Sequence, residues 1–350
     1  MNKKLSLLLK MLVLALGLLA VYIATSKRTD TIGEDDADTI YDFAMGTAVS
    51  IKLYGVSDEK AVATDIVTRI NQLSDETISW RAEGSELYQL NSSYVTGKEY
   101  NVSPELNEIL TMSFKICEDS KGALDISIRP LANLWNIEQA TEDEFSIPDF
   151  ADIADIIPEI GYENISFTDQ GIILNKDGML LDFGATGKGY ALDIIRAELI
   201  EDKVDGAVVT IGGSVLVYGE KSNKKPWNIG IRDPFGQDGD MIGYLTFDGE
   251  TNICISTSGD YEKYIEKDGV RYHHILDRMT GYPASAGLSS VTVVCENGLA
   301  SDGLSTACFV LGYDASISLL ETYGAEGIFV LSDGEIIVTD GLEDIFSKAK

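Results

Sequence analysis

The order of strand-like and helix-like segments is the feature that most constrains how this chain can fold. From residue 39 to the end, both kinds of segment occur without the regular alternation that a parallel α/β sheet requires, and no repeat or clear linker interrupts them. Strands are predicted at residues 47–55, 171–175, 179–182, several places between 206 and 256, and 290–295; helices are predicted at 58–74, 103–122, 188–201, 302–312 and 314–323. The pattern predicts an α+β fold in one compact unit, and it leaves a division into two lobes open.

An apolar segment precedes this unit. Residues 5–24 are almost continuously apolar and long enough to cross a bilayer as one helix, and Lys3 and Lys4 before them favour an N-terminus left inside. An uncleaved anchor and a cleaved signal peptide are the two alternatives; the length of the segment and the lack of a small-x-small cleavage site favour the anchor. We therefore expect a signal or anchor over 1–28, an acidic tether over 29–38, and a folded domain over 39–350 outside the cytoplasmic membrane.

The charge of the chain excludes some partners. Its 57 acidic and 27 basic residues give a formal net charge of −30, which argues against nonspecific binding of nucleic acid or anionic lipid by the folded domain. An anionic ligand would need backbone amides, a few placed bases or a divalent cation. The four cysteines form no C-x-x-C pair and lie among apolar residues, so buried free thiols are favoured over a disulfide.

Two segments carry residue types suited to an anionic ligand or a metal. In 181–195, "LDFGATGKGYALDII", a glycine-rich turn between Asp182 and Lys188 can present backbone amides to an anion, or it is simply a tight strand-to-helix turn. In 299–312, "LASDGLSTACFVLG", Asp302 and Thr306 share a helical face and offer hard oxygen ligands for Mg²⁺ or Ca²⁺. The alternative for Asp302 is a helix N-cap.

The two histidines of the chain, His273 and His274, are adjacent. On an extended segment neighbouring side chains point to opposite faces, so at most one of them readily faces a given site. Segments 43–55, 122–136 and 254–264 also mix polar and apolar residues near predicted strand ends. A core strand, a helix-to-strand corner and a polar turn, respectively, are the favoured interpretations of these three segments.

Nine segments in order give the chain a family resemblance. They are "MGTAVSI", "SWRAEGSELYQLN", "GALDISIRPLANLW", "LDFGATGKGYALD", "TIGGSVLVYG", "PWNIGIRDP", "STSGDYEKY", "RYHHILDRMTGYP" and "ASDGLSTACFVLG". Over roughly residues 40–340 the chain resembles the FAD:protein FMN transferase family, the ApbE-type flavin transferases. The resemblance implies an extracytoplasmic, membrane-tethered enzyme that binds FAD with Mg²⁺. Such an enzyme moves FMN onto a threonine hydroxyl of a target protein, such as an FMN-binding domain of a membrane redox complex, and releases AMP.

The resemblance also implies roles for single residues. Residues matching the family's FAD contacts are Met45 and Trp80 at the flavin, Ala123, Leu124 and Asp125 at the adenine and ribose side, Asp182 and Lys188 around the glycine turn, and Ile275 through its backbone. Those matching the metal site are Ala185 through its backbone oxygen, Asp302 and Thr306 through their side chains, and Ser305 beside them.

His274 matches the family's histidine beside the phosphate chemistry, and it is the candidate general base that activates the acceptor hydroxyl. With an ordinary histidine pKa of about 6.5, transfer would decline below that pH. Arg278 stands where the family usually has proline, so the role of that proline is not carried over. A metal-dependent FAD pyrophosphatase and a flavin-binding protein without turnover are the alternative functions.

Overall fold

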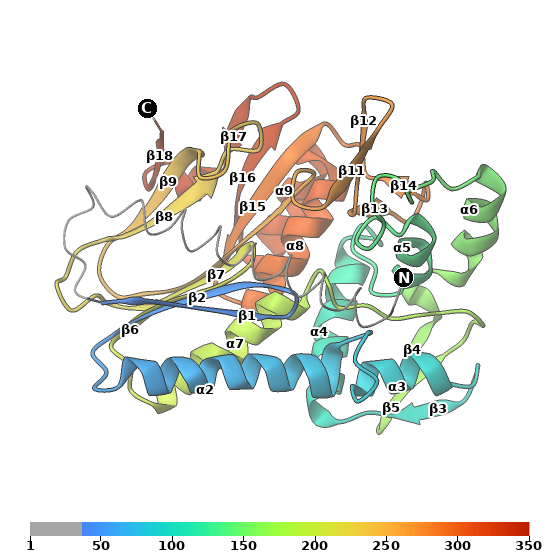
Figure 1. Cartoon of the computed structure of the whole chain (residues 1–350), viewed down its shortest axis with the longest axis horizontal. Coiled ribbons are helices and arrows are strands. Elements are labelled where there is room, and N and C mark those ends of the chain that lie inside the picture. Colours follow the sequence, from blue (N-terminus) through green and yellow to red (C-terminus); the bar gives the residue numbers. More distant parts are fainter. Residues whose placement is uncertain (1–36, 350) are drawn as a thin grey trace, which may run out of the picture. The chain divides into compact units, whose positions relative to one another are not determined.

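An eight-stranded antiparallel sheet is the largest element of the computed structural model, which describes residues 37–349 (Figure 1). Its strands, in spatial order, are β1 (Thr39–Ala44), β2 (Thr47–Tyr54), β6 (Gly206–Ile211), β7 (Ser214–Gly219), β10 (Thr251–Gly259), β15 (Leu288–Cys295), β16 (Glu326–Leu331) and β17 (Ile336–Val338). Every neighbouring pair is antiparallel. The predicted mixture of strands and helices is confirmed, and the antiparallel sheet gives the domain its α+β character.

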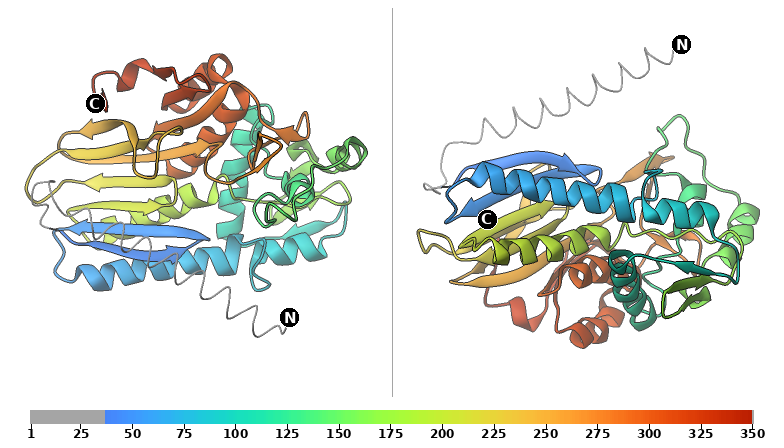
Figure 2. Two further views of the ribbon diagram at one scale, coloured as in Figure 1. Left: turned by 45° about the horizontal axis from the view of Figure 1, so that its top comes forward. Right: turned by 90° about the horizontal axis from the view of Figure 1, so that it is seen from below.

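Four helices form a layer on this sheet. They are α2 (Glu59–Gln72), α7 (Gly187–Glu201), α8 (Gly298–Leu311) and α9 (Tyr313–Tyr323). Each helix contacts the next in that order, α2 packs on β1 and β2, and α8 packs on β10 and β15 (Figure 2). The apolar periodicity explains this layer, because α2 turns its buried residues, including Ile66 and Ile70, to one side. A π-helix, η1 (Leu73–Ile78), continues α2.

Helix α4 (Pro104–Asp119) joins this layer to the rest of the domain by packing against α8. Ser103 caps it by accepting a hydrogen bond from the Leu106 backbone N–H at 3.1 Å, and Pro104 occupies the first helical turn. The chain then leaves through Lys121 and Gly122, both with positive φ. The helix predicted at 103–122 is confirmed.

The remaining elements surround a second apolar cluster or extend the domain's edges. The helices are α3 (Glu86–Ser93), α5 (Arg129–Trp135) and α6 (Phe150–Ile156), with short 3₁₀ turns η2 (Ile157–Glu159), η3 (Tyr162–Asn164) and η4 (Asp340–Leu342). The small sheets are β3 (Glu99–Asn101), β5 (Gly171–Leu174) and β4 (Ile165–Phe167); β18 (Phe346–Lys348), β9 (Met241–Phe247) and β8 (Trp227–Arg232); β11 (Tyr264–Lys267) and β12 (Val270–His273); and β13 (Leu276–Asp277) and β14 (Tyr282–Pro283). The second cluster centres on Trp135, whose ring stacks near Phe145 and Tyr272.

Some boundaries differ from those predicted. Residues 179–182 are not a strand; they contribute one isolated bridge, between Leu180 and Ile128. The helix predicted at 302–312 begins four residues earlier, at Gly298. The four cysteines are free and buried, as predicted.

Residues 5–24, in which a membrane span is predicted, lie outside the described residues, as does most of the predicted acidic tether at 29–38. Within residues 37–349, no helix combines the length and the apolar character needed to cross a membrane.

Candidate functional site

A close contact between helices α7 and α8 positions Asp302. A Cβ atom at Gly189 would lie 2.0 Å from the carbonyl oxygen of Gly298, so the two backbones approach this closely only because residue 189 is glycine. The contact brings the Gly189 N–H to 3.0 Å from Oδ2 of Asp302. Asn297 caps α8 by accepting a hydrogen bond from Ala300 N–H at 2.7 Å, so the interpretation of Asp302 as the helix cap is wrong. The Asp302 carboxylate does not cap the helix and instead contacts groups outside α8.

The Asp302 carboxylate is buried and paired with a lysine. Its Oδ1 atom accepts a hydrogen bond from the Ser214 hydroxyl at 3.0 Å and lies 3.4 Å from the Lys188 ammonium. Lys188 also donates to the carbonyl oxygen of Gly184 at 3.1 Å. The Lys188 ammonium therefore lies between the glycine turn and α8, where its positive charge offsets the cost of burying the Asp302 carboxylate.

Three hydroxyl groups surround the next turn of α8. Ser258 of β10 has its Oγ 2.8 Å from Oγ of Ser305 and 3.0 Å from Oγ1 of Thr306. Ser305 in turn donates to the backbone carbonyl of Asp302 at 2.8 Å. Ser305 and Thr306 thus lie on the side of α8 that faces β10, one turn after Asp302, whose carboxylate contacts β7 and α7.

The glycine turn is also tied to Trp80, through an arginine. Asp182 accepts a hydrogen bond from Gly184 N–H at 2.7 Å through Oδ1, and from Arg129 at 3.1 Å through Oδ2. The Arg129 guanidinium carbon lies 3.3 Å from the ring centroid of Trp80, and that of Arg81 lies 4.2 Å from it. These are cation–π distances. Sequence reasoning assigned Arg129 no role, because it lies in segment 122–136, which was interpreted as a corner.

Glu138 lies among three basic side chains. It pairs with Arg81 at 2.8 Å and with Lys263 at 2.7 Å, and it lies 3.9 Å from Arg129. Burial raises the pKa of Glu138, but the ion pairs, that with Lys263 foremost, hold the pKa below its ordinary value. Sequence reasoning missed Glu138, because nothing in its local segment marks it.

His274 joins this network just beyond β12. Its Nδ1 atom lies 3.2 Å from the Lys263 carbonyl oxygen, which can only accept, so Nδ1 carries the proton and Nε2 keeps its lone pair. Burial, followed by the charge of Lys263, lowers the pKa of His274 from an ordinary 6.5 to about 4. The ring is thus neutral at physiological pH, and the expected decline of transfer below pH 6.5 moves to lower pH.

His273 has different surroundings, as its adjacency to His274 on an extended segment predicts. Its ring is buried, with Nε2 3.0 Å from the Ala284 carbonyl oxygen and its plane edge-on to Phe309. Burial also lowers its pKa. These contacts place His273 in the core rather than in the charged network.

Glu262 is a second missed acid, and it connects the two halves of the network. Burial raises its pKa, and the charges of Lys188, Arg232 and Lys263 oppose that rise. Lys188 belongs to the Asp302 cluster and Lys263 to the His274 cluster, so Glu262 interacts with both. The segment that holds it, 254–264, was predicted only as a polar turn.

Met45 lies at the tip of the β1–β2 hairpin. Met45 and Gly46 both have positive φ, as the central residues of a type I′ turn do. The Met45 methyl carbon would lie 3.4 Å from a Cβ placed on Gly187, so Met45 reaches the end of the glycine turn that contains Ala185.

The residues predicted at the adenine and ribose side lie within the protein interior. The Asp125 carboxylate accepts hydrogen bonds from the Ser127 N–H and hydroxyl, from Tyr162 N–H and from Arg278. Leu124 is buried in the main apolar core, and Ala123 packs against that core. The Ile275 carbonyl accepts from Ala284 N–H at 2.9 Å. Because four protein donors occupy its carboxylate, Asp125 links the segments that hold Ser127, Tyr162 and Arg278.

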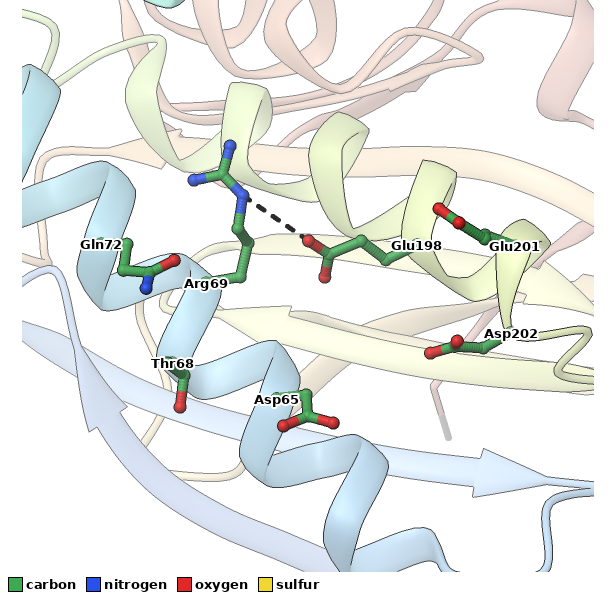
Figure 3. Close-up of a pocket in the computed structure, with 7 residues that line it drawn as sticks. All are labelled: Asp65, Thr68, Arg69, Gln72, Glu198, Glu201 and Asp202. Carbon is green, nitrogen blue, oxygen red and sulfur yellow. Dashed lines mark ion pairs between the residues drawn. The ribbon is translucent and has the colours of Figure 1, made fainter.

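A separate pocket of about 230 Å³ lies between α2 and α7 (Figure 3). Its lining contains four carboxylates and Arg69, which pairs with Glu198 at 3.5 Å, but none of the predicted site residues. Among residues 37–349, no cluster of three or more His, Cys, Asp or Glu side chains is arranged to hold a metal. The predicted metal site has a different composition, with one carboxylate and otherwise hydroxyl and carbonyl oxygens.

Comparison with known proteins identifies the family of this chain. The profile of the ApbE family matches residues 45–329. The chain belongs to the ApbE family. The ApbE-family proteins named FAD:protein FMN transferase from Treponema pallidum and Klebsiella pneumoniae are 29% and 32% identical to it; the alignments cover 87% and 84% of this chain and 87% and 89% of the relatives.

Solved ApbE structures have the same fold. The ApbE protein from Thermotoga maritima superposes with a TM-score of 0.80 at 30% identity, covering 90% of this chain and all of that one. The apo flavinyl transferase ApbE from Pseudomonas stutzeri superposes with a TM-score of 0.76 at 25% identity, covering 91% of this chain and all of that one.

Proposed function

We propose that this ApbE-family protein transfers the FMN moiety of FAD to a threonine hydroxyl of a target protein and releases AMP. The observation that carries the proposal is the continuous network of contacts from Asp302 and Lys188, through Asp182 and Arg129, to His274. It joins residues suited to a pyrophosphate, a flavin and a proton transfer, and relatives that span most of the chain bear the name of this activity.

His274 is the proposed base for the chemical step. The acceptor oxygen forms a bond to the FMN phosphorus, the bond from that phosphorus to the AMP oxygen breaks, and AMP leaves with the electron pair. The hydroxyl proton moves to Nε2 of His274, which is free to accept it because Nδ1 donates to the Lys263 carbonyl. Glu138 pairs with the ammonium of Lys263 at 2.7 Å, and so helps to hold the residue whose backbone carbonyl accepts this hydrogen bond.

The donor set of the predicted metal site fits Mg²⁺, because carboxylate, hydroxyl and carbonyl oxygens are its usual ligands. Asp302 and Thr306, with Ser305 beside them and the Ala185 carbonyl, are proposed to hold it. When bound, Mg²⁺ would neutralise the pyrophosphate and stabilise the leaving phosphate. The residues proposed to contact the flavin side of FAD are Met45, Trp80, Asp182 and Lys188. Ile275 is proposed to contact FAD through its backbone.

The test incubates the protein with FAD, Mg²⁺ and an FMN-binding target domain, and follows in-gel flavin fluorescence. Protein-bound FMN supports the proposal, free FMN indicates a pyrophosphatase, and unchanged FAD indicates a flavin-binding protein. Asp302→Ala should abolish transfer and weaken FAD binding in Mg²⁺. Asp302→Asn, which can still accept from Gly189 N–H, should lose transfer while remaining folded. Glu198→Gln, in the separate pocket, is the matched control and should transfer normally.

The protein is further proposed to act outside the cytoplasmic membrane, tethered through residues 5–24. The support for this proposal is the apolar sequence of that segment and the lysines before it.

A further inference from the structure

We propose that Ser258 of β10 holds the Thr306 hydroxyl as a hydrogen-bond donor, so that the Thr306 oxygen is directed to accept a divalent cation. The inference rests on the proposed metal site and adds a positioning residue to it. Ser258 lies 48 residues before Thr306 in the sequence, and the pairing of α8 with β10 brings their hydroxyls to 3.0 Å.

The direction of each hydrogen bond follows from counting protons. The Asp302 backbone carbonyl can only accept a hydrogen bond, so Ser305 donates its single hydroxyl proton to that carbonyl. Ser258 must then donate to Ser305, because the Ser305 hydroxyl has no second proton to give. With the proton of Ser258 committed, Thr306 must donate to Ser258.

We call this chain of hydrogen bonds, from Thr306 through Ser258 and Ser305 to the Asp302 carbonyl, the hydroxyl relay. The relay leaves only lone pairs on the open side of the Thr306 oxygen. A hydroxyl that ligates a cation must point its proton away from the ion, and the acceptor on Ser258 enforces that orientation before any ion binds. Without Ser258, the Thr306 hydroxyl would rotate about its Cβ–Oγ1 bond, and part of the population would present a proton to the cation. Partners that orient metal ligands in this way typically contribute about 10- to 100-fold to metal affinity.

The chain offers a closely matched control on the same strand. Ser256 lies two residues before Ser258, on the same face of β10, and its hydroxyl also contacts a serine of α8, Ser301, at 2.8 Å. Ser301 is not a predicted ligand and itself donates to the Gly298 carbonyl. Ser256→Ala and Ser258→Ala therefore delete the same group from the same strand–helix contact, and only the second deletion reaches Thr306.

The experiment measures Mn²⁺ binding to the full-length protein with bound FAD, by the loss of the free-ion electron paramagnetic resonance signal. Ser258→Ala should raise the apparent Kd for Mn²⁺ about 10-fold. Ser256→Ala, and Ser258→Thr, which keeps the hydroxyl, should stay within about twofold of the parent. Circular dichroism checks the fold of each variant. If Ser258→Ala does not fold, parent-like binding by Ser258→Thr supports the inference and a 10-fold loss overturns it.

Equal losses in Ser256→Ala and Ser258→Ala would overturn the inference, because they would show a general packing effect. Parent-like binding by Ser258→Ala would also overturn it. Asp302→Ala separates this outcome from failure of the proposed function. If Asp302→Ala loses Mn²⁺ and Ser258→Ala does not, only the relay is wrong; if Asp302→Ala binds Mn²⁺ like the parent, the metal site and the relay both fail.

Discussion

Replacing Arg278 with alanine should lower the free energy of unfolding by about 3 kcal/mol at pH 7.5. The guanidinium is largely buried; it lies 2.9 Å from Asp125, whose side chain is 1% exposed, and 2.6 Å from Glu163, whose side chain is 52% exposed. Removing one partner of a buried pair leaves an uncompensated charge, which typically costs about 3–5 kcal/mol. We take the low end, because Asp125 keeps its bonds from Ser127 and Tyr162, and because the Glu163 pair is half exposed and contributes little.

The loss should shrink as the pH falls. Burial raises the pKa of Asp125, and the positive charge of Arg278 opposes that rise. Without Arg278, the pKa of Asp125 should therefore rise further. The buried carboxylate should then destabilise the variant increasingly as the pH rises through that pKa. The hydrogen bond from Arg278 lowers the pKa of Glu163 below its ordinary value of 4.5, so it stabilises the fold when Glu163 is ionised. This stabilisation is present above pH 4.5, is lost as the pH falls, and is absent from the variant. Both effects make the difference between parent and variant larger at pH 7.5 than at pH 4.5.

Urea unfolding followed by tryptophan fluorescence at both pH values measures this difference. Lys115→Ala is the control, because its ion pair with Asp119 is exposed at the lysine and should contribute no more than about 0.5 kcal/mol. A loss below about 1 kcal/mol for Arg278→Ala at pH 7.5, or an equal loss at both pH values, would refute the assignment of Arg278 as the counter-charge of a buried carboxylate.

Three further predictions concern the histidines and the location of the protein. Single-turnover transfer should stay nearly constant from pH 8 to about pH 5 and fall as the pH approaches 4, since His274 is neutral above its lowered pKa; a midpoint near 6.5 would contradict this. His274→Ala should reduce transfer about 100-fold, whereas His273→Ala should mainly reduce stability; a large loss of transfer in His273→Ala alone would mean that the wrong ring was assigned. Protease added to intact spheroplasts should remove the folded domain, and full protection would contradict the proposed orientation.

The sequence predicted the elements whose signals are local. The Ser103 cap, Pro104 and Gly122 all lie within α4 or at its ends, so that helix could be placed without knowledge of the rest of the chain. Helical spacing likewise put Asp302 and Thr306 on one face. The cap alternative for Asp302 remained open because Asn297, a better-placed cap, lies before the segment that was predicted as helix.

The partners of the site residues could not be predicted, because they depend on the order of strands in the sheet. Ser214 and Ser258 reach Asp302 and Thr306 only because β7 and β10 are neighbours beneath α8. Arg129 meets Trp80 across 49 residues of sequence, through packing that no periodicity reveals. The charged network is a product of tertiary structure, whereas the metal-ligand spacing is a product of one helix.

The charges of this network bear on how a chain of net charge −30 would hold the pyrophosphate of the proposed substrate. Arg81, Arg129 and Lys263 form ion pairs with two carboxylates, those of Glu138 and Asp182, and the charge of Glu262 offsets the remaining cation, so this cluster carries no large excess of either sign. Beyond about one Debye length of 8–10 Å, the surrounding acids dominate and the field repels anions. Attraction is therefore confined to contact distance, where an incoming phosphate can replace a carboxylate as the partner of an arginine. Because Arg81, Arg129 and Lys263 are each already paired within the protein, phosphate binding at this cluster would exchange one ion pair for another, and specificity would come from the geometry of that exchange rather than from long-range steering.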